Sequence, residues 1–165
     1  KYFKIAKPLN ETKIINSQKN RFTKRKLKEY SLVYLIINNL NIFQKKMELI
    51  SEINFSDQHI NKFLLKLTSN LNSENKIEQG SFDDFFNNSE FKPLIKEVRE
   101  FAPIKQIANN IDERAVEIML EELCGEMKKI DLDKKIENLE NKMAEQMDEE
   151  TYNEILSLKI QQKGS

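Results

Sequence analysis

Hydrophobic residues recur at intervals of three and four along most of the chain, which is the spacing of one face of an α-helix. The first such stripe begins near Phe22 and predicts a helix of about five turns. Its members are Leu27, Tyr30, Val33, Tyr34, Ile37 and Leu40. The same region holds the most apolar run of the chain, residues 31–43, which Asn38, Asn39 and Asn41 interrupt. A membrane span needs about 20 apolar residues, so we expect a buried helix at the centre of a domain.

Several shorter patterns follow this helix and predict the remainder of a helical bundle. A short helix over residues 43–50 comes after the Asn-rich break, and Ser56 is expected to cap the next helix. The stripe of that helix is Ile60, Phe63, Leu64, Leu67 and Leu71. Pro93 suits the first turn of a later helix. Together these patterns predict a compact bundle of about six helices that ends near Asn110.

The last 55 residues predict one long helix with two apolar faces in succession. Asp112 is expected to cap it. The first face consists of Val116, Met119, Leu120, Leu123, Met127 and Ile130. The second consists of Leu132, Ile136, Leu139, Met143 and Met147. The offset between them rotates the second face by about 200° on an ideal helix, so a single helix should have two partners.

The first face can lie on the bundle, and the second can pair with a final helix, "EETYNEILSLKIQQ", after a turn at Asp148. We expect Tyr152, Ile155 and Leu158 to close this pair, with Ile160 as a further candidate. The predicted fold is all-α, a bundle followed by a long helix and a C-terminal helical hairpin. The predicted parts are a basic linker from an upstream domain over residues 1–21, a bundle over residues 22–110, and the long helix with the hairpin over residues 111–165.

Composition agrees with a helical protein and limits its chemistry. The 165 residues include three Gly, three Pro and no Trp, so turn-forming material is scarce. Cys124 and His59 are the only residues of their kinds, so neither a disulfide within the chain nor a zinc site of the usual Cys/His type is expected. The N-terminal "KYFKIAKPLN" lacks the apolar stretch of a signal peptide, which favours a cytoplasmic location. Because the chain opens on Lys, we expect it to be a piece of a longer protein.

Charge is balanced over the whole chain but unevenly distributed. Residues 1–30 carry ten Lys or Arg against two Glu, whereas residues 111–165 carry fifteen acids against eight bases. Within the basic end, Lys24, Arg25, Lys26 and Lys28 could contact a phosphate backbone or an acidic peptide. The alternative is a solvated linker that leads into the first helix.

The chain contains carboxylates, a histidine and a cysteine, but their predicted positions do not form a catalytic site. The acidic clusters are expected at a helix start or on a solvated helix face, and comprise Asp83, Asp84, Glu121, Glu122 and Glu126. His59 is expected to cap a helix or to be partly buried. Cys124 suits a small apolar role, because no second His is present to activate it. We therefore expect a chain that is not an enzyme and holds no metal or cofactor.

Two stretches resemble the C-terminal, helicase-binding domain of bacterial DnaG-type DNA primases. The first is "EYSLVYLIINNLNIFQKKMELISEINFSDQHINKFLLKLTSNL", an apolar helix ending in Asn, a short helix rich in Leu and Glu, and a Phe-Ser-Asp turn that opens the next helix. The second is "ENKMAEQMDEETYNEILSLKIQQ", which is similar to the family's closing hairpin. The likeness spans roughly Lys24 to Lys163. One departure is Leu40 after Asn39, where the family commonly has proline.

The resemblance implies a non-catalytic part of the primase, the DNA-directed RNA polymerase that makes primers in DNA replication. It implies that this part docks, chiefly through its hairpin, on the N-terminal domains of the DnaB-type replicative helicase in the cytoplasmic replisome. If Tyr152, Ile155 and Leu158 close the hairpin, the residues left for the helicase are Asn153, Leu156, Lys159, Ile160, Gln161 and Gln162. Alternatively, Leu156 packs against the bundle. In some family members, basic residues comparable to Lys24, Arg25, Lys26 and Lys28 also receive the acidic tail of single-stranded-DNA-binding protein.

Two other functions remain open at this stage. The bundle could be the N-terminal domain of the helicase itself, although that protein would continue into an ATPase domain. The chain could instead bind nucleic acid through its basic N-terminal stretch, which predicts an affinity that falls steeply with salt. No membrane and no small-molecule substrate is expected as a partner.

Overall fold

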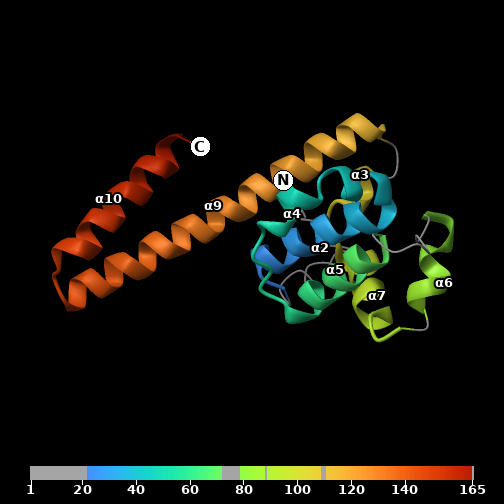
Figure 1. Cartoon of the computed structure of the whole chain (residues 1–165), viewed down its shortest axis with the longest axis horizontal. Helices are drawn as coiled ribbons and strands as arrows, with labels where there is room; N and C mark the ends of the chain where they lie inside the picture. Colours follow the sequence, from blue (N-terminus) through green and yellow to red (C-terminus); the bar gives the residue numbers. More distant parts are fainter. Residues whose placement is uncertain (1–21, 72–78, 88, 109–110, 165) are drawn as a thin grey trace, which may run out of the picture.

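The computed structural model describes residues 22–71, 79–87, 89–108 and 111–164. Within these ranges every regular element is a helix and no strand is present, so the predicted all-α class is confirmed. A compact group of helices packs against one end of a very long helix, and the other end of that helix carries an antiparallel hairpin away from the group (Figure 1). Among the described residues, no helix combines the length and the apolar character that crossing a membrane would need.

The compact group, here called the bundle, contains α2 (Lys24–Asn38), α3 (Leu40–Lys45), α4 (Met47–Ser51), α5 (Gln58–Leu71), α6 (Phe82–Asn87), α7 (Lys92–Phe101) and α8 (Lys105–Ala108). A 3-10 turn, η1 (Gln79–Ser81), precedes α6. The long helix is α9 (Glu113–Glu145), and the last helix is α10 (Glu149–Gly164). Sequence predicted one short helix over residues 43–50, but the structure has α3 and α4, because Lys46 leaves helical geometry between them at φ −110° and ψ 16°.

Helix α2 is the central helix of the bundle, as its apolar pattern predicts. It contacts α3, α7, α8 and α9. The predicted stripe was too narrow, since Leu32, Leu35 and Ile36 are fully buried in addition to Tyr30, Val33 and Ile37. A helix that is covered on several sides needs apolar residues around most of its circumference. Asn39 ends α2 by donating its side-chain amide to the Leu35 carbonyl at 3.0 Å.

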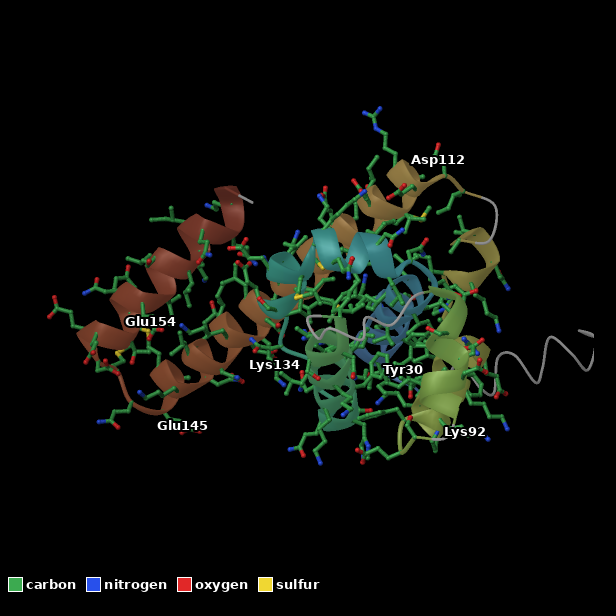
Figure 2. The ribbon with its side chains drawn as sticks, turned by 45° about the vertical axis from the view of Figure 1, so that its right-hand side comes forward. Tyr30, Lys92, Asp112, Lys134, Glu145 and Glu154 are labelled. Atoms are coloured by element: carbon green, nitrogen blue, oxygen red, sulfur yellow. The ribbon has the colours of Figure 1, made fainter. Side chains whose placement is uncertain are left out.

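The first half of α9 belongs to the same hydrophobic core. Val116, Leu120, Cys124 and Met127 are buried in the core cluster that includes α2. The predicted cap is confirmed, because the Asp112 carboxylate accepts a hydrogen bond from the Ala115 amide at 2.8 Å. The core therefore continues well past the predicted domain boundary at residues 110 and 111, and the remainder of α9 projects from it (Figure 2).

Cys124 has the small apolar role predicted for it, and its burial has a measurable consequence. Desolvation raises the pKa of its thiol from 9.0 to about 11. The unfolded chain gives up this proton at a lower pH than the folded chain does. Stability from the buried thiol is therefore complete below about pH 9 and should be lost as the pH rises toward 11. Urea unfolding at pH 8 and at pH 10 should show a larger loss for the natural chain than for a Cys124→Ala variant, and equal losses would contradict this.

Glu29 is a buried charge that the sequence patterns did not reveal. Its side chain is fully buried in α2. The carboxylate accepts hydrogen bonds from the Ser56 amide at 2.6 Å, the Ser56 hydroxyl at 2.9 Å and Arg25 Nε at 3.2 Å. The prediction that Ser56 caps α5 is therefore wrong. Asp57 takes that role by accepting from the His59 amide at 2.8 Å, because the Ser56 side chain is already bonded to Glu29.

Candidate docking surface on the C-terminal hairpin

The hairpin is built by a tight turn between α9 and α10. Asp148 caps α10, since its carboxylate accepts from the Thr151 amide at 2.7 Å and from the Thr151 hydroxyl at 2.6 Å. These two hydrogen bonds lower the pKa of Asp148. Met147 lies in the turn and is 87% exposed. The prediction that Met147 continues the inner stripe of α9 is wrong, because the helix ends two residues earlier, at Glu145.

The inner face of the hairpin joins the second apolar stripe of α9 to one face of α10. Ile136 of α9 is buried, and the residues of α10 that turn inward are Thr151, Ile155, Leu158 and Gln162. Three polar contacts flank this seam. They are the ion pair of Lys135 with Glu154 at 2.8 Å, the ion pair of Lys159 with Glu140 at 2.6 Å, and the hydrogen bond from Gln162 to Asp133 at 2.6 Å.

Tyr152 does not close the hairpin, contrary to the prediction. It is 49% exposed, whereas Thr151 beside it is buried. The Asp148 carboxylate accepts from the Thr151 hydroxyl, so this polar side chain can be buried without losing its hydrogen bond. Adjacent helical residues point about 100° apart, so Tyr152 faces outward. The hydrophobic pattern did not predict an inner position for Thr151, because Thr is short and polar.

The consequence is a row of exposed apolar side chains along the outward side of α10. Tyr152, Leu156 and Ile160 are 49%, 42% and 73% exposed and follow one another at intervals of four residues. We call these three residues the outer stripe. Single exposed apolar residues are ordinary on a protein surface, but a continuous row of them is typical of an interaction site. A row at helical spacing suits a helix that docks by its face.

The six residues predicted for docking do not all share this surface. Leu156 and Ile160 belong to the outer stripe, and Asn153 is exposed beside it. Leu156 is not part of the bundle core. The remaining three are placed differently. Lys159 and Gln162 bind α9 as described, and Gln161 is exposed and lines a pocket at the root of the hairpin. Tyr152, which sequence reasoning assigned to the interior, takes a place in the outer stripe.

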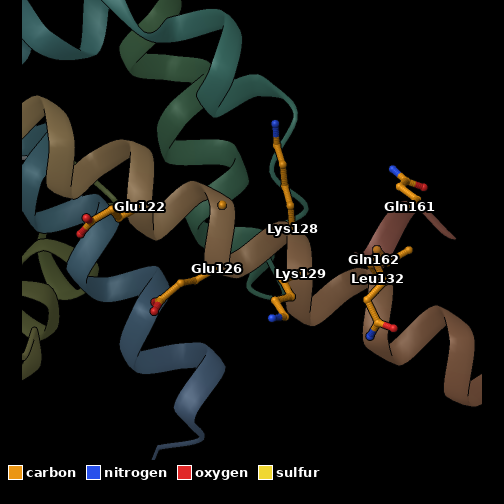
Figure 3. A pocket seen from close by; sticks show the side chains of 8 residues that line it. Glu122, Glu126, Lys128, Lys129, Leu132, Gln161 and Gln162 are labelled. Carbon is orange, nitrogen blue, oxygen red and sulfur yellow. The ribbon is translucent and has the colours of Figure 1, made fainter. Parts of the chain in front are cut away.

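That pocket lies between the middle of α9 and the end of α10 (Figure 3). Its volume is about 520 Å³. Acidic, basic, amide and apolar groups all contribute to it, and the lining residues are Glu122, Gly125, Glu126, Lys128, Lys129, Leu132, Gln161 and Gln162. The mixed lining favours no particular ligand, so the outer stripe remains the better candidate site.

The basic cluster at the start of α2 mostly binds acidic groups of the chain itself. Arg25 engages both carboxylate oxygens of Asp131 in α9, one of them at 3.1 Å. Lys26 forms an ion pair with Asp57, and Lys28 forms one with Glu126. Lys24 is exposed and makes no ion pair within the described ranges. An acidic tail or a phosphate backbone would therefore compete with internal carboxylates for three of the four predicted contacts.

Arg25 also holds the projecting half of α9 in place. Besides Asp131, its guanidinium donates to the carbonyls of Met127 and Asn54, and its Nε donates to the buried Glu29. The sequence pattern identified Arg25 as part of a basic cluster but did not predict that it binds groups within the chain. The i, i+4 spacing of Arg25 and Glu29 was the available signal, whereas Asp131 is distant in sequence and no local pattern pairs it with Arg25.

No family model, no curated protein and no solved structure matches this chain. Within the described residues, no group of three or more His, Cys, Asp or Glu is placed to hold a metal ion.

Proposed function

We propose that this chain is the helicase-binding part of a bacterial DnaG-type primase, and that it docks on the N-terminal domain of a DnaB-type replicative helicase through the outer stripe of α10. The observation that carries the proposal is the outer stripe itself, three exposed apolar side chains on one face of the terminal helix. Burying a Leu or Ile side chain contributes about 1.5–3 kcal/mol, so a matching groove would bind this face favourably. The choice of the helicase as the partner rests on the resemblance of the sequence to the primase domain.

The way α9 carries the hairpin supports the same proposal. From Met127, its last residue in the bundle core, to its end at Glu145, α9 extends for about 27 Å at 1.5 Å per residue. The hairpin therefore stands clear of the bundle and can be reached from several sides (Figure 1). The contacts of Arg25 with Asp131 and Met127 anchor the base of this projection. A partner can thus engage α10 without rearranging the bundle.

Titration calorimetry with the purified helicase N-terminal domain tests the proposal. We expect the intact chain to bind it, and a chain that ends at Lys134 to fold but not to bind. That truncation removes α10 and the last third of α9 while it keeps Asp131, the partner of Arg25. Circular dichroism should confirm that the truncated chain is still helical. Full affinity of the folded truncated chain, or no binding by the intact chain, would contradict the proposal.

A further inference from the structure

The outward face of α10 has a symmetric order of side chains. Leu156 lies at its centre, Tyr152 and Ile160 lie four residues to either side, and Glu149 and Lys163 lie seven residues to either side. On an ideal helix all five fall within about 40° of the direction of Leu156. The helix thus presents an acid at one end of the face, a base at the other, and apolar residues between them.

The two terminal charges of this face are available to a partner. Glu149 and Lys163 are both exposed, and the ion pairs found among the described residues include neither of them. The charged residues that α10 does commit to α9, Glu154 and Lys159, flank the inner seam instead. The unpaired acid and base therefore remain in line with the apolar row.

We propose that two copies of this chain associate weakly through an antiparallel pairing of their α10 helices, with a two-fold axis at Leu156. In this pairing Glu149 lies opposite the partner's Lys163, and the same contact recurs at the other end. Tyr152 lies opposite the partner's Ile160, and the two Leu156 side chains meet on the axis. A two-fold interface uses the same surface on both subunits and must therefore be self-complementary, which is the property that this face has.

Charge also determines the direction of the pairing. A parallel arrangement would place Glu149 beside the partner's Glu149 and Lys163 beside the partner's Lys163, and like charges in contact oppose association. The antiparallel arrangement instead pairs opposite charges at both ends. The apolar row alone would accept either direction, so the charges at its ends select the antiparallel one.

We expect the dimer to be weak, because a single pair of helices buries only a small area. Stable protein interfaces bury about 1,200–2,000 Å² in total, which a single helix pair with three apolar residues on each side does not reach. This inference rests on the proposed function in one respect, namely that the same outer stripe would bind the helicase. Self-association would then cover the stripe while the partner is absent, and a helicase groove with a larger contact surface would displace the second copy.

Sedimentation equilibrium of the whole chain over a wide concentration range, at low salt, tests the dimer. We expect reversible association that weakens as salt screens the end charges. Glu149→Lys and Lys163→Glu should each weaken it by about tenfold, because each replaces two symmetry-related attractions with two repulsions. The double variant Glu149→Lys/Lys163→Glu should restore association to within about threefold of the natural chain.

The double variant is a demanding control because both substitutions oppose the dipole of α10 and cannot strengthen the helix itself. Circular dichroism of each variant should confirm that α10 remains folded. Leu156→Glu provides a variant that leaves the helix ends unchanged, and it should abolish association by placing two carboxylates on the axis. A chain that is monomeric at every concentration, or a double variant that is no better than the single ones, would overturn the inference.

The outcome is separable from that of the proposed function. A monomeric chain that still binds the helicase domain removes the dimer and leaves the docking proposal in place. A dimer that responds to the charge reversals while the chain ignores the helicase domain removes the docking proposal and supports the self-pairing.

Discussion

Replacing Glu29 with alanine should lower the free energy of unfolding by about 3–5 kcal/mol, the usual cost of breaking a buried charge pair from one side. The Glu29 carboxylate is fully buried and accepts three hydrogen bonds, two from Ser56 and one from Arg25. Its loss leaves the Ser56 amide and hydroxyl without their acceptor, and it removes one of the two carboxylates that pair with Arg25, the other being Asp131. The total free energy of unfolding of a typical domain is about 5–15 kcal/mol, so the expected loss is a large fraction of it.

The measurement is urea unfolding followed by circular dichroism, with Glu122→Ala as the matched control. Glu122 is an exposed glutamate of α9, so its removal should change stability by no more than about 0.5 kcal/mol. The Glu29 variant should also melt roughly 10 °C lower than the natural chain. If both variants unfold at the same urea concentration, the network around Glu29 does not stabilise the bundle.

The second large effect is expected on binding rather than on stability. Leu156→Ala should weaken binding to the helicase N-terminal domain by about tenfold, and Leu156→Ala/Ile160→Ala should weaken it by about a hundredfold. Both residues are already exposed to solvent, Leu156 by 42% and Ile160 by 73%. Their truncation should therefore shift the melting temperature by no more than about 2 °C.

Leu65→Ala is the matched control for these variants. Leu65 is 72% exposed on α5, in the bundle rather than the hairpin, and the substitution removes the same atoms. It should leave both the affinity and the melting temperature unchanged. If Leu156→Ala instead lowers the melting temperature by several degrees at unaltered affinity, Leu156 stabilises the fold and the outer stripe is not the docking surface.

Local patterns predicted the elements of this fold well, because each helix carries its own stripe and its own cap. The buried central helix, the Asp112 cap and the turn at Asp148 all depend on residues that are close in sequence. The class of the fold and the hairpin follow from the same local signals. The size of the core does not, since the burial of Leu32, Leu35 and Ile36 depends on how many helices cover α2.

The rotation of α10 and the internal use of the basic cluster could not be predicted in the same way. Apolar residues occur on both sides of α10, and the inner position is taken by Thr151, whose hydroxyl is bonded to Asp148, rather than by Tyr152. The contact of Arg25 with Asp131 joins residues that lie far apart in sequence, so no periodicity indicates it. Sequence therefore located the terminal helix for which we propose a docking role, and the structure shows which of its residues remain exposed.

The most direct test of the docking claim is an NMR titration of the isotope-labelled chain with the unlabelled helicase N-terminal domain. The account predicts that the signals of Tyr152, Leu156 and Ile160 change first and most, while those of the bundle core around Leu32 and Leu120 stay in place. Changes confined to the bundle or to the start of α2, with α10 unaffected at saturation, would contradict it.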